Sequence, residues 1–474
     1  MTAHVLVAIG TRPEAIKMLP VVAALRRSDY LDPVVISTGQ HSEMVREILA
    51  MEDITPDVDL SVRSNGSLNH LVSEVMVRFE EFCRERYAHD ATLGTPARVN
   101  AADSTDVFER GYPAGLLVHG DTSSAMAAAL SAFHLRIPVG HVEAGLRTGS
   151  ILTPYPEELN RQVISRIAAF HLAPTDVNRQ NLIREGIDSQ LVFVTGNTGI
   201  DTLVTATKMP SGITDPQLLE ALEGPRPLLV ATAHRRENWG GGLARIGSGL
   251  RQIAEAHPEV QIVLVTHPNE AARAEVAGPV AGLEQVLVTS ALDYVPFAHL
   301  LASATFAISD SGGIQEEAPA LGTPVLVTRD STERGEGVEA GTLRLVGTDP
   351  ARIAGAAHEL LTDSAAYDAM AFAENPYGDG RAAERVVAAL ENLAGFTPAP
   401  QRYGSGFNRK RVLVAGGYPP PAALHLSMRA GTVPDGVGAM TDRADPSPSP
   451  SPSPSPSPSP SSSLSPSATE TAPT

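Results

Sequence analysis

The sequence predicts an α/β protein built from two doubly wound domains. Two sets of short apolar segments alternate with stretches of helical character, the first set before about residue 205 and the second after it. Each short segment is apolar throughout, which is typical of parallel strands that helices cover on both faces of a sheet. The chain of 474 residues is too long for one hydrophobic core, so the two sets indicate two domains.

The strands expected in the first domain, residues 1–205, are HVLVAIG, PVVIST, AGLLVHGD, IPVGHVEAG, HLAPT and LVFVTGN. Those expected in the second domain, residues 206–375, are PLLVATAH, VQIVLVTH, QVLVTSA, ATFAISDSG, TPVLVT and TLRLVGT. Helix-breaking residues in PSGITDPQ place the boundary between Gly199 and Pro227. Because ligands of doubly wound sheets bind at the carboxyl ends of the strands, we expect the functional site in a cleft between the two domains.

Three segments fall outside this alternation. Residues 88–113 are polar and punctuated by Gly and Pro, and they indicate a surface insertion in the first domain. We expect residues 376–396 to form a terminal helix that packs back on the first domain. Residues 397–474 contain a long Ser-Pro repeat that cannot bury a core, which predicts a disordered tail.

Composition and charge argue against several classes of function. A net charge of −18 disfavours a surface for nucleic acid or anionic lipid, since such partners require dispersed Lys and Arg. No apolar stretch reaches the roughly 18 residues of a membrane span and no secretory signal is visible, so we expect a soluble cytoplasmic protein. The single cysteine, Cys83, excludes an internal disulfide or a thiolate metal cluster within one chain.

The run GTRPEAIKMLP, residues 10–20, joins the first expected strand to a helix. Pro13 suits the first turn of a helix, where free backbone N–H groups attract anions. Arg12 and Lys17 would add two full charges on nearly the same helix face, which suits a phosphate. Taken alone, the run is explained equally well as a plain turn with solvated charges. Pro20 predicts a kinked or shortened helix.

A second run, ISDSGGIQEEAP at residues 308–319, has a similar design. The hydroxyl of Ser311 and the backbone N–H groups of Gly312 and Gly313 can approach a diphosphate closely. Glu317 follows in the first turns of the next helix, where it could accept hydrogen bonds from ribose hydroxyls. A Gly-Gly turn alone is weak evidence, but the two runs together predict a nucleotide site.

Three successive segments each bring a carboxylate to the end of a strand or the start of a helix. They are HGDTSSAM with Asp121, VGHVEAGLRTG with Glu143 and PYPEELNRQ with Glu157. Structural explanations exist as well, because Asp121 or Thr122 could cap a helix and Glu157 suits a helix start. Three acids directed to one edge of a sheet predict acid–base chemistry.

The run ATAHRRENW places His234, Arg235 and Arg236 at the end of a strand in the second domain. A histidine beside two arginines can donate to an anionic leaving group, or it can be an ordinary loop residue. No spacing of the HExxH or CxxC kind occurs, so we expect no catalytic metal.

Taken together, the motifs resemble those of non-hydrolysing UDP-N-acetylglucosamine 2-epimerases in order and spacing from about residue 3 to 395. They are GTRPEAIKMLP, HGDT, GHVEAGLRTG, PEELNR, HRREN, DSGGIQEEAP, RDSTER and NPYGDG. The resemblance implies two Rossmann-like domains of the GT-B type, a homodimer, and interconversion of UDP-GlcNAc and UDP-ManNAc without a metal or nicotinamide cofactor. It also implies a route, in which UDP is eliminated across C1–C2 to give 2-acetamidoglucal and is then re-added with the C2 proton on the other face.

The resemblance also assigns residues by their positions in the motifs. It implies that Asp121, Glu143 and Glu157 are the acid–base residues, with no assignment of which removes the proton, and that His234 assists the leaving UDP. The expected substrate contacts are Arg12, Lys17, Arg161, Arg235, Phe297, Ser311, Gly312, Gly313, Glu317 and Arg334. Phe297, in the run YVPFAHL, matches a position that packs on uracil, although core packing explains it equally well.

The sequence departs from the family pattern at two places. Many bacterial members bind a second, regulatory UDP-GlcNAc near a Gln-His loop, an Arg on the next helix and an HxNP turn. Gln40 and His41 keep the loop, but Glu74 replaces the Arg and the turn at His267 is shortened, which predicts a weakened regulatory site. Gly335 replaces the usual Pro and should loosen the loop that carries Arg334.

Three alternatives stay open at this point. A GT-B glycosyltransferase shares the fold and the nucleotide contacts, but it needs an acceptor groove and no set of three acids. A catalytically silent protein that binds nucleotide sugars would require the insertion or the tail to block the cleft. An epimerase for a modified UDP-N-acetyl sugar is not distinguished, because the sequence does not reveal the contacts to the sugar ring.

Overall fold

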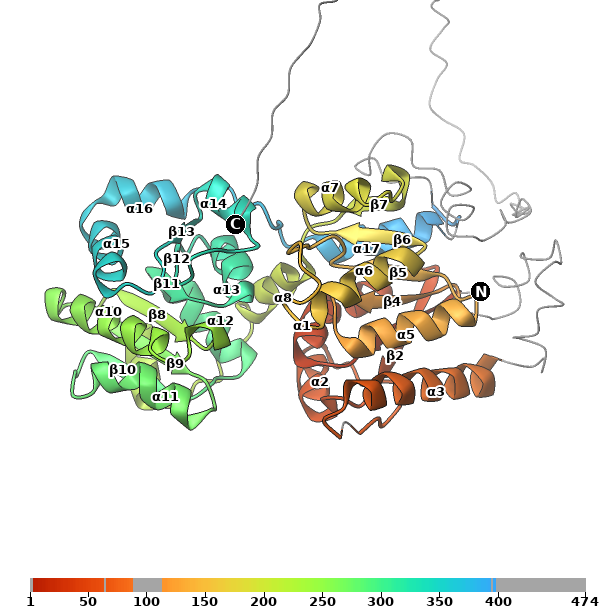
Figure 1. The fold of residues 1–474 in the computed structure, drawn as a ribbon, viewed down its shortest axis with the longest axis horizontal. Coiled ribbons are helices and arrows are strands. Elements are labelled where there is room, and N and C mark those ends of the chain that lie inside the picture. The colour runs from red at the N-terminus through yellow and green to blue at the C-terminus, as the bar shows by residue number, and fades with distance from the viewer. Residues whose placement is uncertain (1–2, 64, 88–112, 394, 398–474) are drawn as a thin grey trace, which may run out of the picture. The chain divides into compact units, whose positions relative to one another are not determined.

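The computed structural model describes residues 3–63, 65–87, 113–393 and 395–397, and the structural statements below refer to these residues (Figure 1). The predicted insertion at 88–113 and the predicted tail at 397–474 lie almost entirely outside them. Two parallel sheets are present, each with its own helices, which confirms the predicted fold class.

The first sheet is wholly parallel, with the strand order β3-β2-β1-β4-β5-β6-β7. Its strands are β1 (Ala3–Ile9), β2 (Leu31–Ser37), β3 (Val58–Asp59), β4 (Gly115–His119), β5 (Val139–Val142), β6 (Phe170–Ala173) and β7 (Val192–Val194). Its helices are α1 (Arg12–Leu25), α2 (Ser42–Leu49), α3 (Leu68–Tyr87), α5 (Ser123–His134), α6 (Glu157–Ile167), α7 (Asp176–Arg184) and α8 (Thr198–Ala206). The sequence does not predict β3, because two residues are too few to give an apolar run.

The second sheet is also wholly parallel, with the order β10-β9-β8-β11-β12-β13. Its strands are β8 (Leu228–Ala233), β9 (Gln261–Thr266), β10 (Val286–Thr289), β11 (Phe306–Ser309), β12 (Val325–Val327) and β13 (Leu343–Leu345). The later helices are α9 (Pro216–Glu223), α10 (Gly242–Ala256), α11 (Glu270–Ala277), α12 (Tyr294–Ser303), α13 (Gly312–Glu317), α14 (Gly335–Ala340), α15 (Pro350–Thr362), α16 (Ser364–Ala371) and α17 (Ala382–Leu393).

The strands are apolar throughout because helices bury both faces of each sheet. In β1, Val5, Val7 and Ile9 pack into one cluster with residues of α1 and α17. The intervening Leu6 and Ala8 pack into a second cluster with residues of α3 and α5. From Val5 to Ile9, side chains on both faces of β1 are therefore buried, as is typical of parallel sheets.

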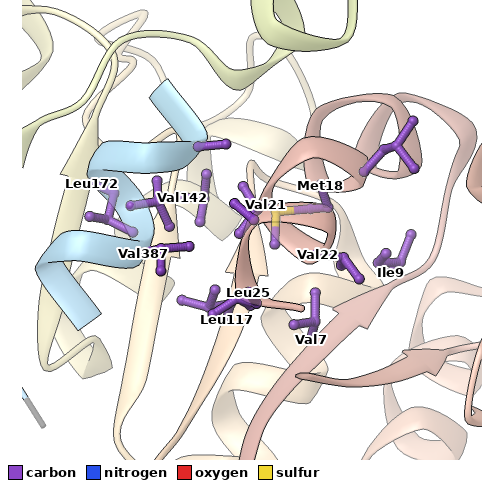
Figure 2. Close-up of a cluster of buried hydrophobic side chains, with 14 of the residues drawn as sticks. Val7, Ile9, Met18, Val21, Val22, Leu25, Leu117, Val142, Leu172 and Val387 are labelled. Carbon is purple, nitrogen blue, oxygen red and sulfur yellow. The ribbon is translucent and has the colours of Figure 1, made fainter. Parts of the chain in front are cut away.

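The last helix, α17, packs on the core of the first sheet although it follows the second sheet in the sequence. Figure 2 shows its Val387 beside Val142 of β5 and Leu172 of β6, in the cluster that also contains Leu25 of α1. Asp201 of α8 caps α17, because its carboxylate accepts hydrogen bonds from the first two backbone N–H groups of the helix at 3.1 and 2.8 Å.

Helix α1 continues through Pro20 to Leu25, so the expected shortening is wrong. Pro20 has no N–H to donate to the carbonyl of Ile16 one turn earlier. That carbonyl accepts a hydrogen bond from Thr202 Oγ1 of α8 at 2.5 Å. A side chain from a neighbouring helix thus replaces the donor that proline lacks.

The strand order reverses once in each sheet, between β1 and β4 and between β8 and β11. Ligands of doubly wound sheets bind beyond the carboxyl ends of the strands at such switch points. The runs that follow these four strands are GTRPEAIK, GDTSSAM, HRRENW and DSGGIQEE. Four of the candidate motifs therefore lie at the two switch points.

In the described part of the chain, no helix is both long and apolar enough to span a membrane.

Candidate functional site

The turn after β1 is closed by the side chain of Glu14. Its Oε2 accepts hydrogen bonds from the backbone N–H groups of Gly10 at 2.8 Å and Thr11 at 2.6 Å, and its Oε1 accepts one from Thr122 Oγ1 at 2.7 Å. Gly10 cannot carry a side chain here, because a Cβ would lie 2.3 Å from Ser124 Oγ. Burial raises the pKa of Glu14 to about 7, although these hydrogen bonds act in the opposite direction. Glu14 thus ties the turn to the segment after β4.

The two cations of this turn have different surroundings. Arg12 is half-buried, and no ion pair joins it to another described residue. Lys17 contacts the carboxylate of Glu143 and lies 3.8 Å from Oε2 of Glu316 in α13. Burial opposes the charge of Lys17, but these two carboxylates more than offset it and raise the pKa of Lys17 above its usual value. Lys17 is therefore a buried, charged group that connects the two switch points.

Glu143 follows β5 in an unusual backbone conformation. Its φ is 63°, in the left-handed region that residues other than Gly seldom adopt. One carboxylate oxygen contacts Lys17, and the other lies 3.7 Å from Nε2 of His119. Burial would raise the pKa of Glu143, but Lys17 and then His119 lower it to about 2. A non-glycine residue in this conformation often marks a functional position.

Asp121 is held by Arg161 from α6. Nε and Nη2 of Arg161 lie 2.8 and 2.7 Å from Asp121 Oδ2, and Nη1 donates to Oε2 of Glu158 at 3.1 Å. Thr122 caps α5 by accepting a backbone hydrogen bond, so Asp121 has no capping duty. Sequence reasoning missed Glu158, which is fully buried next to the predicted Glu157.

Glu157 begins α6 and is half-buried. Its Oε2 is buried and has no hydrogen-bond partner in the described chain, which is an unfavourable state for an acceptor. This oxygen is therefore a candidate for contact with a ligand. Among the described residues, no hydrogen bond or ion pair connects Glu157 with Asp121 or Glu143.

At the second switch point, the buried carboxylate of Asp310 organises the segment after β8. It accepts hydrogen bonds from the backbone N–H groups of His234 at 3.0 Å and Arg235 at 2.9 Å, and from Nδ2 of Asn238 at 2.9 Å. The imidazole Nδ1 of His234 lies 3.4 Å from the same carboxylate. Burial lowers the pKa of His234, although Asp310 acts in the opposite direction. His234 also stacks on His267, with ring centroids 6.4 Å apart.

The Ser-Gly-Gly segment after β11 begins α13 and lies under Arg334. A Cβ on Gly312 would lie 2.9 Å from the Cζ of Arg334, whereas a Cβ on Gly313 would meet no atom closer than 3.9 Å. Arg334 donates from Nε to Oε1 of Glu316 at 2.8 Å and from Nη1 to Glu333. The space beside Gly313 is open to a ligand, while Gly312 is needed to seat the guanidinium.

Two further predicted contact residues are Glu317, the last residue of α13, and Phe297. Burial raises the pKa of Glu317 to about 8, against the attraction of Lys17. Phe297, on α12, is half-buried and packs against the apolar clusters on one face of the second sheet. Its ring therefore contributes to the core, and the part that stays exposed is available for a ligand.

The residues at the family departures have partners of their own. Glu74 accepts a hydrogen bond from Nε of Arg78 at 3.0 Å, one turn further along α3. Gln40 accepts one from Ser124 Oγ at 3.0 Å. Gly335 begins α14, and a Cβ placed on it would meet no atom within 4 Å. The charge of Glu74 is thus compensated within its own helix.

Four charged residues from different motifs meet in what we call the Lys17 cluster, which consists of Lys17, Glu143, Glu316 and Arg334. Three of them were predicted from the sequence. Glu316 was missed, although it receives hydrogen bonds from Arg334 and Asn197. The sequence signal for Glu316 is the pair of acids in GGIQEE, of which the motif assigns a role only to the second, Glu317.

Comparisons with known proteins point to one family. A sequence model described as UDP-N-acetylglucosamine 2-epimerase matches residues 97–391. A probable UDP-N-acetylglucosamine 2-epimerase of Ralstonia solanacearum is 44% identical over 393 residues, which are 82% of this chain and 98% of the relative. The enzyme of that name from Escherichia coli K12 is 41% identical over the same shares of the two chains.

Solved structures give the same result. The crystal structure of a Listeria monocytogenes protein assigned to this family has 38% identity and a TM-score of 0.74, over 85% of this chain and 99% of that one. The UDP-GlcNAc 2-epimerase of Neisseria meningitidis, solved with UDP-GlcNAc bound, has 36% identity and a TM-score of 0.70, over 82% of this chain and 100% of that one. The family model, the relatives that match over almost their whole length, and the GT-B-like arrangement of two parallel sheets lead to the same conclusion. The chain belongs to the UDP-N-acetylglucosamine 2-epimerase family.

Proposed function

We propose that this protein interconverts UDP-GlcNAc and UDP-ManNAc by elimination and re-addition of UDP. Family membership supports the overall reaction. The contact between Lys17 and Glu143 is the observation that carries the proposal for this chain. It joins a cation of the proposed diphosphate site to one of the three candidate acids, which is the combination that the reaction needs.

The chemistry explains why both kinds of group are required. The C2–H bond of the sugar has no adjacent carbonyl to acidify it, so removal of the proton has to be linked to departure of a leaving group. In the first step a carboxylate takes the C2 proton, the C1–O bond breaks with its electron pair going to UDP, and a C1–C2 double bond forms. In the second step the UDP oxygen adds back to C1 and an acid delivers a proton to the opposite face of C2. The sequence of steps is redox neutral, and the intermediate is 2-acetamidoglucal.

The candidate acids have environments suited to different roles. Glu143 is ionised at neutral pH, with its pKa lowered to about 2, and Glu157 has a buried carboxylate oxygen without a partner in the described chain. Asp121 shares Arg161 with Glu158. In this proposal one of the three removes the C2 proton and another returns a proton to the opposite face.

Departure of UDP requires stabilisation of the charge that develops on its diphosphate. Arg12, Lys17 and Arg334 supply cations, and the N–H groups beside Ser311 and Gly313 supply hydrogen-bond donors. His234, fixed through its backbone by Asp310, donates to the leaving oxygen. Electrostatic groups of this kind contribute a large share of rate enhancement, since single donors are worth about 100- to 1,000-fold. Glu317 contacts the ribose and Phe297 the uracil ring in this proposal.

The experiment that tests the proposal is conversion of UDP-GlcNAc by purified protein, followed by separation of the two epimers. We expect Asp121→Asn, Glu143→Gln and Glu157→Gln to lower kcat by about 100- to 10,000-fold each. Glu80→Gln is the matched control, because Glu80 pairs with Arg84 on an exposed face of α3. Unchanged turnover in all three site variants would contradict the assignment of the acids. Failure of the wild-type protein to convert UDP-GlcNAc, with modified UDP-sugars converted instead, would contradict the proposed substrate.

A further inference from the structure

Two of the three cations proposed to hold the diphosphate, Lys17 and Arg334, are paired with carboxylates in this structure. Lys17 contacts Glu143 and lies 3.8 Å from Glu316, and Arg334 pairs with Glu316 and Glu333. These carboxylates contact the same cations that an anionic ligand would contact. An incoming diphosphate therefore has to compete with them for the cations.

The ionised form of Glu143 is stabilised more by Lys17 than by any other described group. Lys17 is its hydrogen-bond donor, and the side chains of the two residues are only 15% and 16% exposed. The charged or titratable groups that face Glu143 are Lys17 from α1, His119 from the end of β4, His141 from β5 and Arg334 from the segment before α14. Among these, Lys17 has the largest effect, and Glu316 of α13 shares it.

A carboxylate in contact with a lysine is a poor proton acceptor, because the pair is more stable when the carboxylate stays ionised. A general base works best when its proton affinity matches the working pH. In the free protein Glu143 is held far from that condition, with its pKa lowered to about 2. The ammonium group of Lys17 therefore has to leave the carboxylate before Glu143 can exchange protons with a sugar.

We propose that the diphosphate of the substrate draws Lys17 away from Glu143, so that this carboxylate becomes competent for proton transfer only while the nucleotide is bound. The ammonium group exchanges a carboxylate partner for a phosphate partner, and no bond other than hydrogen bonds is made or broken. The inference rests on the proposed function, because it names the event that switches on one of its acids. Since UDP stays bound during the reaction, Lys17 stays away from Glu143 until the second proton transfer is complete.

Proton uptake on ligand binding tests this directly and does not depend on turnover. UDP-GlcNAc is titrated calorimetrically into the protein at about pH 5 in two buffers with different ionisation enthalpies, which gives the number of protons bound per ligand. Both epimers carry the same diphosphate, so turnover leaves this number unchanged. We expect the wild-type protein to take up part of a proton as Glu143 is released, and Glu143→Gln to lose that uptake.

The affinity for UDP is a second measurement. It would not change if the ion pair between Lys17 and Glu143 were purely structural. Glu143→Gln should bind UDP several-fold more tightly than the wild type, because Lys17 no longer has to leave a carboxylate, whereas Lys17→Met should bind it more weakly. Glu80→Gln should change neither affinity nor proton uptake. Equal proton uptake and equal affinity in the wild type and Glu143→Gln would overturn the proposal.

A crystal structure with UDP bound tests the exchange without any variant. We expect Lys17 Nζ within hydrogen-bond distance of a phosphate oxygen and beyond 4 Å from both carboxylate oxygens of Glu143, whereas in the unliganded protein it contacts Oε1. Lys17 remaining on Glu143 beside a bound diphosphate would overturn the proposal. If the protein epimerises UDP-GlcNAc normally but Lys17 stays on Glu143, the further inference is wrong and the proposed function stands. If Lys17 moves to the diphosphate but no epimerisation occurs, the proposed function is wrong, and the link between the ion pair and the diphosphate stands.

Discussion

Gly312→Ala is expected to disturb the seat of Arg334, and Gly313→Ala provides a control one residue away in the same helix. A Cβ at residue 312 would lie 2.9 Å from Cζ of Arg334, closer than real Cβ contacts allow, and 3.0 Å from both Nη atoms, which is tighter than most real contacts. The guanidinium would have to move, and with it the hydrogen bond to Glu316 at 2.8 Å. A Cβ at residue 313 would meet Ser311 Oγ at 3.9 Å, which is an ordinary contact.

The expected magnitude follows from two opposing effects. Forcing an extra methyl group into a packed site costs about 1–3 kcal/mol, whereas replacing Gly by Ala in a helix gains up to about 1 kcal/mol. Both variants share the helix gain, so their difference isolates the steric cost. We therefore expect Gly312→Ala to be less stable than Gly313→Ala by about 1–3 kcal/mol.

Urea unfolding followed by tryptophan fluorescence measures this difference. The single tryptophan, Trp239, lies between β8 and α10 and so reports on the second sheet, in which α13 follows β11. A second measurement separates packing from ligand contact, since Gly313→Ala should keep its stability and still weaken UDP binding if the diphosphate approaches there. Equal stability of the two variants, within about 0.5 kcal/mol, would refute the reasoning about Arg334.

Three further predictions concern the polar interior of the first sheet. Arg161→Met should destabilise the protein by about 3–5 kcal/mol in urea unfolding, because it leaves the fully buried carboxylate of Glu158 without its cation; an unaffected unfolding midpoint would contradict this. Asp201→Ala should cost about 1 kcal/mol and speed hydrogen exchange in the first turn of α17, whose N–H groups it caps; unchanged exchange there would show that the cap is dispensable. The folded pKa of Glu143 is about 2, below its ordinary value of 4.5, so its contribution to stability is present above pH 4.5 and is lost as the pH falls toward 2. The wild type should therefore lose stability relative to Glu143→Gln over that range in urea titrations, and a constant difference would contradict the ion pair.

Most of the fold could be predicted from the sequence, because parallel strands buried on both faces leave a strong signal. Each predicted apolar run overlaps a strand of the structure. The exception is β3, which pairs only through Val58 and Asp59 at the edge of the sheet and carries no run of its own. The continuation of α1 through Pro20 could not be predicted, since it depends on a hydroxyl of α8 that lies far away in the sequence.

For the candidate site, the sequence predicts the motifs, and the structure adds contacts that the sequence does not predict. Residues such as Lys17 and Glu143 stand out because they follow strands, and the strand order brings those strand ends together. Glu316, Glu158 and Asp310 were missed because their roles arise from contacts between segments that are distant in the sequence. Each of these three carboxylates is the sequence neighbour of a predicted residue. The sequence therefore shows the carboxylates, but no local rule tells which residue of a neighbouring pair has a role in the site.

The most direct test of the proposed reaction is to incubate the purified protein with UDP-GlcNAc in D2O, without added metal or nicotinamide, and to follow the sugar C2 by proton NMR. Elimination and re-addition predict UDP-ManNAc with deuterium at C2, because the proton that returns comes from an acid in exchange with solvent. Binding of UDP-GlcNAc with neither epimer formation nor exchange at C2 would contradict the proposed function.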